Sequence, residues 1–265
     1  MFEDRFVQVV LEPARQDLAF TNFPFTKHCG NAHGPFDTTT SVLCYCLCYQ
    51  HTHFESLTAI IRSGAFDQLQ QPLIIDVGAG PATVPLALAQ HYVTDLRRDP
   101  LALHYVDVER SPEMRAIAGR FLNDATLFRD VHRVSLADLT DMARAQELGP
   151  LINGSDGVIF SMSFILRQPF VDTALAEYIA SLVIALARDS GLPTFVLSQE
   201  QSGGAYDRVN AFFNRFSTNG YRIEGGYGRR MTQPHRQMLL DGRIPHQATH
   251  SLDNVSFAAG RVIPL

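Results

Sequence analysis

The stretch from Leu73 to Leu88, LIIDVGAGPATVPLAL, decides the fold of this chain. It opens with a short apolar run, bends at Gly78 and Gly80, and continues into a segment with helical spacing. Glycine lets the backbone turn sharply and come close to a ligand, and the first turn of a helix presents free N–H groups. The stretch therefore predicts a strand that turns into a helix beside a ligand site.

Short apolar runs alternate with helical stretches over most of the chain after Leu73. Alternation of this kind indicates βαβ units, a mainly parallel sheet and helices on both faces. We expect strands at 73–77, 103–108, 132–136, 156–162 and 193–198, with helices near 82–91, 112–123, 139–147, 169–188 and 204–219. Pro112 and Pro169 fall where the first turn of a helix tolerates proline.

The two ends of the chain differ from this alternating region. Residues 1–71 have helical patterning, including a helix predicted from Thr38 to Ser63, and we expect them to form a helical N-terminal extension that acts as a lid and substrate wall. Residues 72–265 are the expected ligand-binding domain. After Gly220 the pattern favours extended segments that add an antiparallel edge to the sheet, at 221–231, 235–242 and 255–263.

The composition is that of an ordinary globular protein, because 46% of its 265 residues are hydrophobic and 18% are charged. A net charge of −5 disfavours a nucleic-acid partner, although a local basic patch would keep that partner open. The N-terminus shows no signal-peptide pattern, and the apolar stretches are shorter than the ~20 residues that span a bilayer. We expect a cytoplasmic protein without a membrane partner.

Three of the four cysteines lie close together, at Cys44, Cys46 and Cys48, and histidines are nearby. In a helix, thiols two residues apart point to different sides, so they do not converge on a metal ion. The spacing also differs from the structural zinc patterns. We therefore expect these cysteines to pack in a core helix, and we predict no metal site.

The turn at Gly78 and Gly80 suits three classes of ligand to different degrees. A phosphate-binding P-loop needs a Lys before Ser or Thr at the helix start, which this turn lacks. A dinucleotide fingerprint needs a third glycine where Thr83 stands, and the Asp76 carboxylate would repel a pyrophosphate. S-adenosylmethionine carries an ammonium group, a sulfonium charge and no phosphate, so an acid at the end of the strand favours it.

The segment DVGAGPATVPLA resembles the first motif, D/E-x-G-x-G, of the class I S-adenosylmethionine-dependent methyltransferases, and the resemblance extends over roughly residues 70 to 200. It implies an α/β Rossmann-like methyltransferase fold, with a doubly wound, mainly parallel, seven-stranded sheet. It also implies that Glu109, in YVDVERSPEM, binds the ribose hydroxyls of S-adenosylmethionine and that Asp138, in VSLADLTDM, binds its adenine amino group. Asp107, two residues before Glu109 on the same face, is the alternative ribose ligand.

The resemblance assigns residues to both ends of the site. The expected cofactor ligands are Asp76, Gly78, Ala79, Gly80, Glu109, Arg110, Asp138, Leu139 and Ser161. In the family the end of the fourth strand lies beside the transferred methyl, so the expected floor of the reaction site is Ser161, Met162 and Ser163. The expected contacts to the acceptor come from the aromatic N-terminal segment and from the ends of the fourth and fifth strands, at Tyr45, His28, Phe164, Gln199 and Glu200.

Methyl transfer is an in-line displacement at a sulfonium carbon, in which the enzyme mainly aligns the reactants, so a catalytic triad is not required. The sequence lacks the motifs of enzymes that methylate exocyclic base amines, cytosine C5 or ribose 2′-oxygens. We therefore expect a methyltransferase that acts on a small molecule. An RNA or protein methyltransferase and a non-catalytic methyltransferase-fold binding subunit are the alternatives.

Overall fold

The computed structural model describes residues 5–19, 36–142, 148–201, 206–232 and 252–265. Strand β1 (Leu73–Val77) is buried along its whole length, which its unbroken apolar run before Asp76 explains. The other strands of its sheet are β2 (Leu101–Val108), β3 (Phe128–Leu136), β4 (Val158–Ser163), β5 (Thr194–Gln201), β6 (Tyr221–Thr232) and β7 (Leu252–Pro264).

The seven strands follow the order β3-β2-β1-β4-β5-β7-β6. Strands β1 to β5 pair in parallel, whereas β7 pairs antiparallel with both β5 and β6. The prediction of a mainly parallel seven-stranded sheet with an antiparallel C-terminal edge is therefore confirmed. The extended segment predicted at 235–242 lies outside the described residues.

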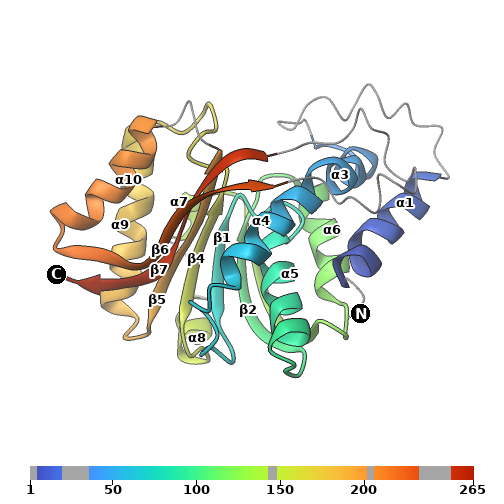
Figure 1. Cartoon of the computed structure of the whole chain (residues 1–265), viewed down its shortest axis with the longest axis horizontal. Coiled ribbons are helices and arrows are strands. Elements are labelled where there is room, and N and C mark those ends of the chain that lie inside the picture. The colour runs from blue at the N-terminus through green and yellow to red at the C-terminus, as the bar shows by residue number, and fades with distance from the viewer. Residues whose placement is uncertain (1–4, 20–35, 143–147, 202–205, 233–251) are drawn as a thin grey trace.

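Helices cover both faces of the sheet, and each face has its own apolar core (Figure 1). One face packs against the helices before β1 and against α5 (Thr83–Gln90), its continuation η3 (His91–Asp95) and α6 (Pro112–Leu122). The other face packs against α7 (Leu139–Met142), α8 (Leu148–Asn153), α9 (Thr173–Asp189) and α10 (Tyr206–Thr218). Within the described ranges, no helix combines the length and apolarity that crossing a membrane requires.

The helices before β1 are η1 (Val7–Leu11), α1 (Glu12–Ala19), α3 (Thr39–Tyr45), η2 (Cys46–Gln50) and α4 (His51–Ile61). The last three form the helix predicted after Thr38, and a capping box between Thr38 and Ser41 begins it. The cysteines of this helix are fully buried in the core, as the packing prediction requires. These helices share that core with α5 and α6.

The first residues of α6 and α9 show how local chemistry sets the start of a helix. Pro112 is the first residue of α6, after Ser111 whose hydroxyl accepts from the Met114 N–H, so the prediction for Pro112 is confirmed. The prediction for Pro169 is wrong, because α9 begins only at Thr173. Its start is capped by Asp172, whose carboxylate accepts from the Leu175 N–H at 2.8 Å and sets the boundary.

A buried ion pair joins β2 to the edge strand β3. The Asp107 side chain is 1% exposed, and Arg133 donates to it from Nε and Nη2 at 2.8 and 2.9 Å. The Ser135 hydroxyl donates to the same carboxylate at 2.8 Å. Asp107 therefore has its charge and its lone pairs satisfied inside the sheet.

We expect Arg133→Met to lower the free energy of unfolding by about 3–5 kcal/mol, because it leaves the Asp107 carboxylate buried without its cationic partner. The control is Arg120→Met, which breaks a pair with Asp17 whose side chains are 49% and 42% exposed. Exposed pairs of this kind contribute less than about 1 kcal/mol. Urea denaturation of both variants measures the difference, and equal losses would contradict the structural role assigned to Arg133.

Candidate active site

A cavity of about 830 Å³ opens at the carboxyl ends of the parallel strands. The chain passes from β1 to β2 on one side of the sheet and later to β4 on the other, so this end is the topological switch point where such sheets bind ligands. The cavity is lined by the turn after β1, the ends of β2 and β3, the loop after β4, the start of α9 and three side chains from the segment before β1, which are Phe36, Tyr45 and His53.

The turn after β1 has an unusual backbone. Gly78, Gly80 and Ala82 all have positive φ angles, of 69°, 53° and 60°. A Cβ atom on Gly78 would lie 2.0 Å from the Ile165 side chain, whereas one on Gly80 would have no protein neighbour within 4 Å. Gly78 is therefore needed for packing, and Gly80 leaves its open side to the cavity, which it lines.

Glu109 stands at the end of β2, directly beside this turn. One carboxylate oxygen accepts from the Gly80 N–H at 2.9 Å, and the other accepts from the Ser111 N–H at 2.9 Å. Glu109 lines the cavity, whereas Asp107 is held by Arg133 and is not among the lining residues. Of the two acids considered as ribose ligands, the structure therefore brings only Glu109 to the cavity.

Asp138 also lines the cavity, where it caps the short helix α7. Its carboxylate accepts from the Thr140 N–H at 3.1 Å and from Arg110 at 2.9 Å. The Thr140 bond and the Arg110 guanidinium lower the pKa of Asp138, so this side chain is an anion. Leu139 and Arg110 lie beside it on the wall, and the Arg110 guanidinium stacks over the Phe170 ring.

Asp76 lies one residue before the end of β1 and is only 2% exposed. It is not among the lining residues but sits behind the turn, where Tyr105 donates to it at 3.2 Å. Burial raises its pKa to about 7. Ser161, opposite Asp76 on β4, lowers this pKa, but its hydroxyl makes no full hydrogen bond with any residue in the described part of the chain.

The end of β4 places its residues at different depths. Ser161 and Met162 are both 0% exposed, and Ser163 alone of the three lines the cavity. Side chains alternate along a strand, so Met162 enters the core beneath α9 while Ser161 faces Asp76. Of the three residues predicted as the floor, the structure therefore brings only Ser163 to the cavity, together with the residue after it, Phe164.

Gln199 and Glu200 do not reach the cavity, because both side chains are buried on β5. Glu200 accepts from the Leu166 N–H at 2.8 Å and so holds the loop after β4, and burial raises its pKa to about 8. Gln199 donates to the Ser163 hydroxyl at 3.4 Å. Both residues therefore lie behind the wall of the cavity and do not line it in this structure.

Tyr45 and His53 lie on one face of the helix before β1 and both line the cavity. The Tyr45 hydroxyl and His53 Nδ1 are 3.0 Å apart, and burial raises the pKa of Tyr45 well above its usual value. The prediction missed His53 as a site residue, although its spacing from Tyr45, eight residues in a predicted helix, places the two on the same face. His28 lies outside the described residues.

Phe164 follows β4 with a strained backbone. Its φ of 60° is in the left-handed region, which disfavours any side chain with a Cβ. The Phe164 N–H donates to the Gln199 carbonyl at 2.8 Å, and the ring lies against the His53 ring with centroids 4.4 Å apart. Strain of this kind persists where the surroundings determine it, and it clusters at functional sites.

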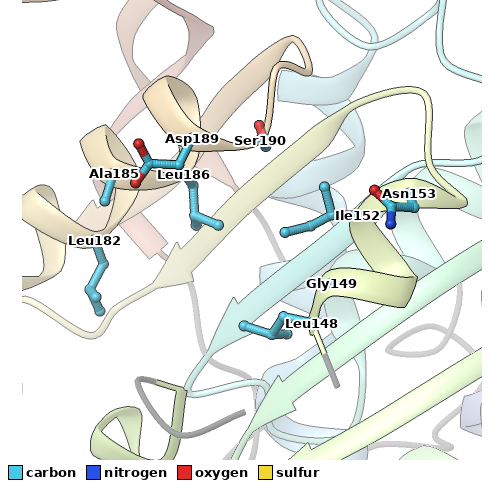
Figure 2. Close-up of a pocket in the computed structure, with 9 residues that line it drawn as sticks. All are labelled: Leu148, Gly149, Ile152, Asn153, Leu182, Ala185, Leu186, Asp189 and Ser190. Atoms are coloured by element: carbon cyan, nitrogen blue, oxygen red, sulfur yellow. The ribbon is translucent and has the colours of Figure 1, made fainter. Parts of the chain in front are cut away.

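A second hollow, of about 380 Å³, lies between α8 and α9 (Figure 2). Its lining is mainly apolar, with Leu148, Ile152, Leu182 and Leu186, and its one charged residue, Asp189, is paired with Arg188. The end of α8 precedes β4 and the end of α9 precedes β5, so this hollow lies at the opposite end of the strands from the cavity beside Glu109.

No protein-family model and no curated protein matches this sequence. Solved structures with a similar fold include a SAM-dependent methyltransferase from Leishmania major, at 11% identity over 95% of this chain and 82% of that chain, with a TM-score of 0.47. A cyclopropane-fatty-acyl-phospholipid synthase-like protein from Lactobacillus casei has 14% identity, covers 80% and 91%, and has a TM-score of 0.44. The mitomycin 7-O-methyltransferase MmcR has 12% identity, covers 97% and 69%, and has a TM-score of 0.43.

We expect the pH dependence of stability to change in Asp76→Asn. The Asp76 carboxyl ionises near pH 3.8 when unfolded and near pH 7 when folded. Between these values the folded state holds a proton that the unfolded state has lost, so the free energy of unfolding falls as the pH rises.

Asp76→Asn removes this contribution, so its free energy of unfolding relative to the wild type should increase between pH 4 and pH 7 in urea denaturation. The exposed carboxyl of Asp99 provides the control, and Asp99→Asn should follow the wild type across the same range. Parallel curves for Asp76→Asn and the wild type would contradict the raised pKa.

A second stability test concerns the strained Phe164 backbone. Phe164→Gly and Phe164→Ala remove the same ring, but only alanine keeps a Cβ at a φ of 60°. We expect the glycine variant to be more stable by about 1 kcal/mol, the reverse of the usual order. Phe170, whose φ is not positive, is the control position, and the same order at both positions would argue against the strain.

Proposed function

We propose that this chain transfers a methyl group from S-adenosylmethionine to a small-molecule acceptor. The observation that carries this proposal is the Glu109 carboxylate, which is hydrogen-bonded to the Gly80 and Ser111 N–H groups at the lip of a cavity of about 830 Å³. Each carboxylate oxygen has a second lone pair, so both can also accept from the two hydroxyls of a ribose.

Charge favours this cofactor over a dinucleotide. A pyrophosphate at the turn would lie close to the Glu109 carboxylate and in front of Asp76, and neither acid has a cationic partner in the contacts of the turn. An ammonium group beside Asp76 would instead stabilise the ionised carboxylate, whose pKa burial raises to about 7. A cationic amino-acid end therefore suits the residues behind the turn.

Unsatisfied buried oxygens support the same fit. Within the described ranges, the Ser161 hydroxyl and Gln50 Oε1 are buried without a hydrogen-bond partner. Ser161 lies opposite Asp76, and the Gln50 side chain donates to the Pro81 carbonyl of the turn at 3.0 Å. Buried polar atoms without partners are costly, and an ammonium group supplies three donors. These residues lie behind the turn, where they would receive the amino-acid end of the cofactor.

The other end of the cofactor would lie along the ends of β2 and β3. Leu139 and Met114 offer apolar surface for an adenine ring, and Asp138 offers an acceptor for its amino group. The Asp138 carboxylate is shared with Arg110 and Thr140, so adenine would use a remaining lone pair. The cofactor, when bound, supplies an electrophilic methyl carbon on a sulfonium.

The segment before β1 forms the acceptor side of this proposal. Phe36, Tyr45 and His53 line the cavity, and the Phe36 carbonyl accepts from the Ser111 hydroxyl at 2.7 Å, which ties this segment to the start of α6. We assign residues 1–71 to the substrate wall and residues 72–265 to the cofactor-binding domain. The chain would exclude water and align the acceptor with the methyl carbon for in-line displacement.

We expect Glu109→Gln to bind S-adenosylhomocysteine about 10-fold or more weakly than the wild type, because the amide replaces one acceptor oxygen with a donor. Titration calorimetry measures this affinity. Glu177→Gln makes the same chemical change on the exposed surface of α9 and should bind as the wild type does. Absence of binding of both S-adenosylmethionine and S-adenosylhomocysteine to the wild type would refute the proposed function.

A further inference from the structure

The acceptor side of the cavity carries an aromatic wall, which we define as Phe36, Tyr45, His53 and Phe164. The Tyr45 ring lies edge-on to Phe36, with centroids 5.3 Å apart, and edge-on to His53, with centroids 6.0 Å apart. Phe164 covers the His53 ring at 4.4 Å. Methyl transfer by alignment alone does not require a hydrogen-bonded tyrosine and histidine within this wall.

Hydrogen bonds from β5 position this wall. Gln199 is fully buried, and its amide donates to the His53 carbonyl at 3.5 Å and to the Ser163 hydroxyl at 3.4 Å. The Phe164 backbone is kept in its strained form by its bond to the Gln199 carbonyl, while Glu200 holds the loop at Leu166. The helix before β1 and the end of β4 are thus joined where the Tyr45 and His53 side chains meet.

We propose that the Tyr45–His53 pair accepts the proton of a hydroxyl group on a flat aromatic acceptor, that is, a phenol. This inference rests on the proposed function and specifies its acceptor. As the acceptor oxygen forms a bond to the methyl carbon, the carbon–sulfur bond breaks and its electron pair stays on sulfur. The acceptor proton passes to the Tyr45 oxygen, and the Tyr45 proton passes to His53 Nδ1, 3.0 Å away, so His53 ends as an imidazolium.

The chemistry of the lining favours a phenol over an amine. The carboxylates among the described lining residues are Glu109 and Asp138, which stand at the ends of β2 and β3 and not on the aromatic wall. The wall itself therefore holds no acid that could bind an ammonium acceptor, whereas a neutral aromatic ring can stack on it. Burial keeps Tyr45 protonated by raising its pKa, so Tyr45 gives its proton to His53 only as it receives the proton of the acceptor, and it stays neutral throughout.

The first experiment separates this inference from the proposed function. Calorimetry establishes whether the protein binds S-adenosylhomocysteine, and methyl-labelled S-adenosylmethionine is then supplied with para-substituted phenols or with the matching anilines. We expect label on the phenols. Failure to bind the cofactor would overturn the proposed function together with this inference. Cofactor binding with label on the anilines alone, or on no phenol, would overturn this inference only.

The second experiment compares His53→Asn and Tyr45→Phe on two phenols of similar shape. 4-Methoxyphenol must lose its proton during transfer, whereas 4-nitrophenol is already ionised at pH 8. We expect kcat to fall about 10²-fold or more for 4-methoxyphenol and less than about 10-fold for 4-nitrophenol, with the affinity for S-adenosylhomocysteine unchanged.

The controls are His132→Asn and Tyr221→Phe, which make the same substitutions on β3 and β6, away from the cavity lining. Both controls should keep wild-type rates on the two phenols. Equal losses on the two phenols in His53→Asn and Tyr45→Phe would mean that the pair only shapes the cavity, and would overturn the assignment of proton transfer.

Discussion

The hydrogen bonds that the Glu109 carboxylate accepts from Gly80 and Ser111 hold the whole site together. They join the turn after β1 to the end of β2 and to the start of α6, which are three separate elements of the fold. The Ser111 hydroxyl extends the connection to the Phe36 carbonyl and so to the segment before β1. Glu109 positions the glycine turn directly and, through Ser111, the Phe36 end of the segment before β1. The cofactor side and the acceptor side of the cavity therefore depend on the same few hydrogen bonds.

Buried acids surround this site, and the fold treats each of them differently. Asp107 is neutralised by the Arg133 guanidinium and serves the sheet. Glu200 accepts from the Leu166 N–H and so shapes the loop after β4, and Asp76 accepts from the Tyr105 hydroxyl behind the glycine turn. Burial raises the pKa of the last two, to about 8 and about 7. Asp107 therefore supports the sheet and Glu200 supports the loop after β4, whereas Asp76 forms no ion pair with the described residues behind the turn.

Several elements could be predicted because their causes are local. The apolar runs placed β1 to β5, and the sequence around Ser111 and Pro112 placed the start of α6. The burial of individual side chains at the ends of the strands could not be predicted in the same way. Ser161, Met162 and Ser163 are adjacent in sequence, but strand alternation and the length of β4 bury the first two and expose the third to the cavity. Gln199 and Glu200 were likewise expected at the cleft edge, although β5 continues past them and buries both.

The sequence by itself determined the alternating α/β fold, the glycine turn and the presence of acids after the first three strands, because these follow from period, residue size and charge. Only the tertiary structure decided which acid reaches the cavity. Asp107 lies on β2 and Glu109 follows its last residue. Arg133 from β3 pairs with the Asp107 carboxylate, whereas the Glu109 carboxylate turns to the Gly80 N–H and lines the cavity. The meeting of His53 with Phe164 was likewise decided by packing, because it joins a helix before β1 to a loop after β4. Contacts between segments this far apart depend on how the layers pack, which no local pattern encodes.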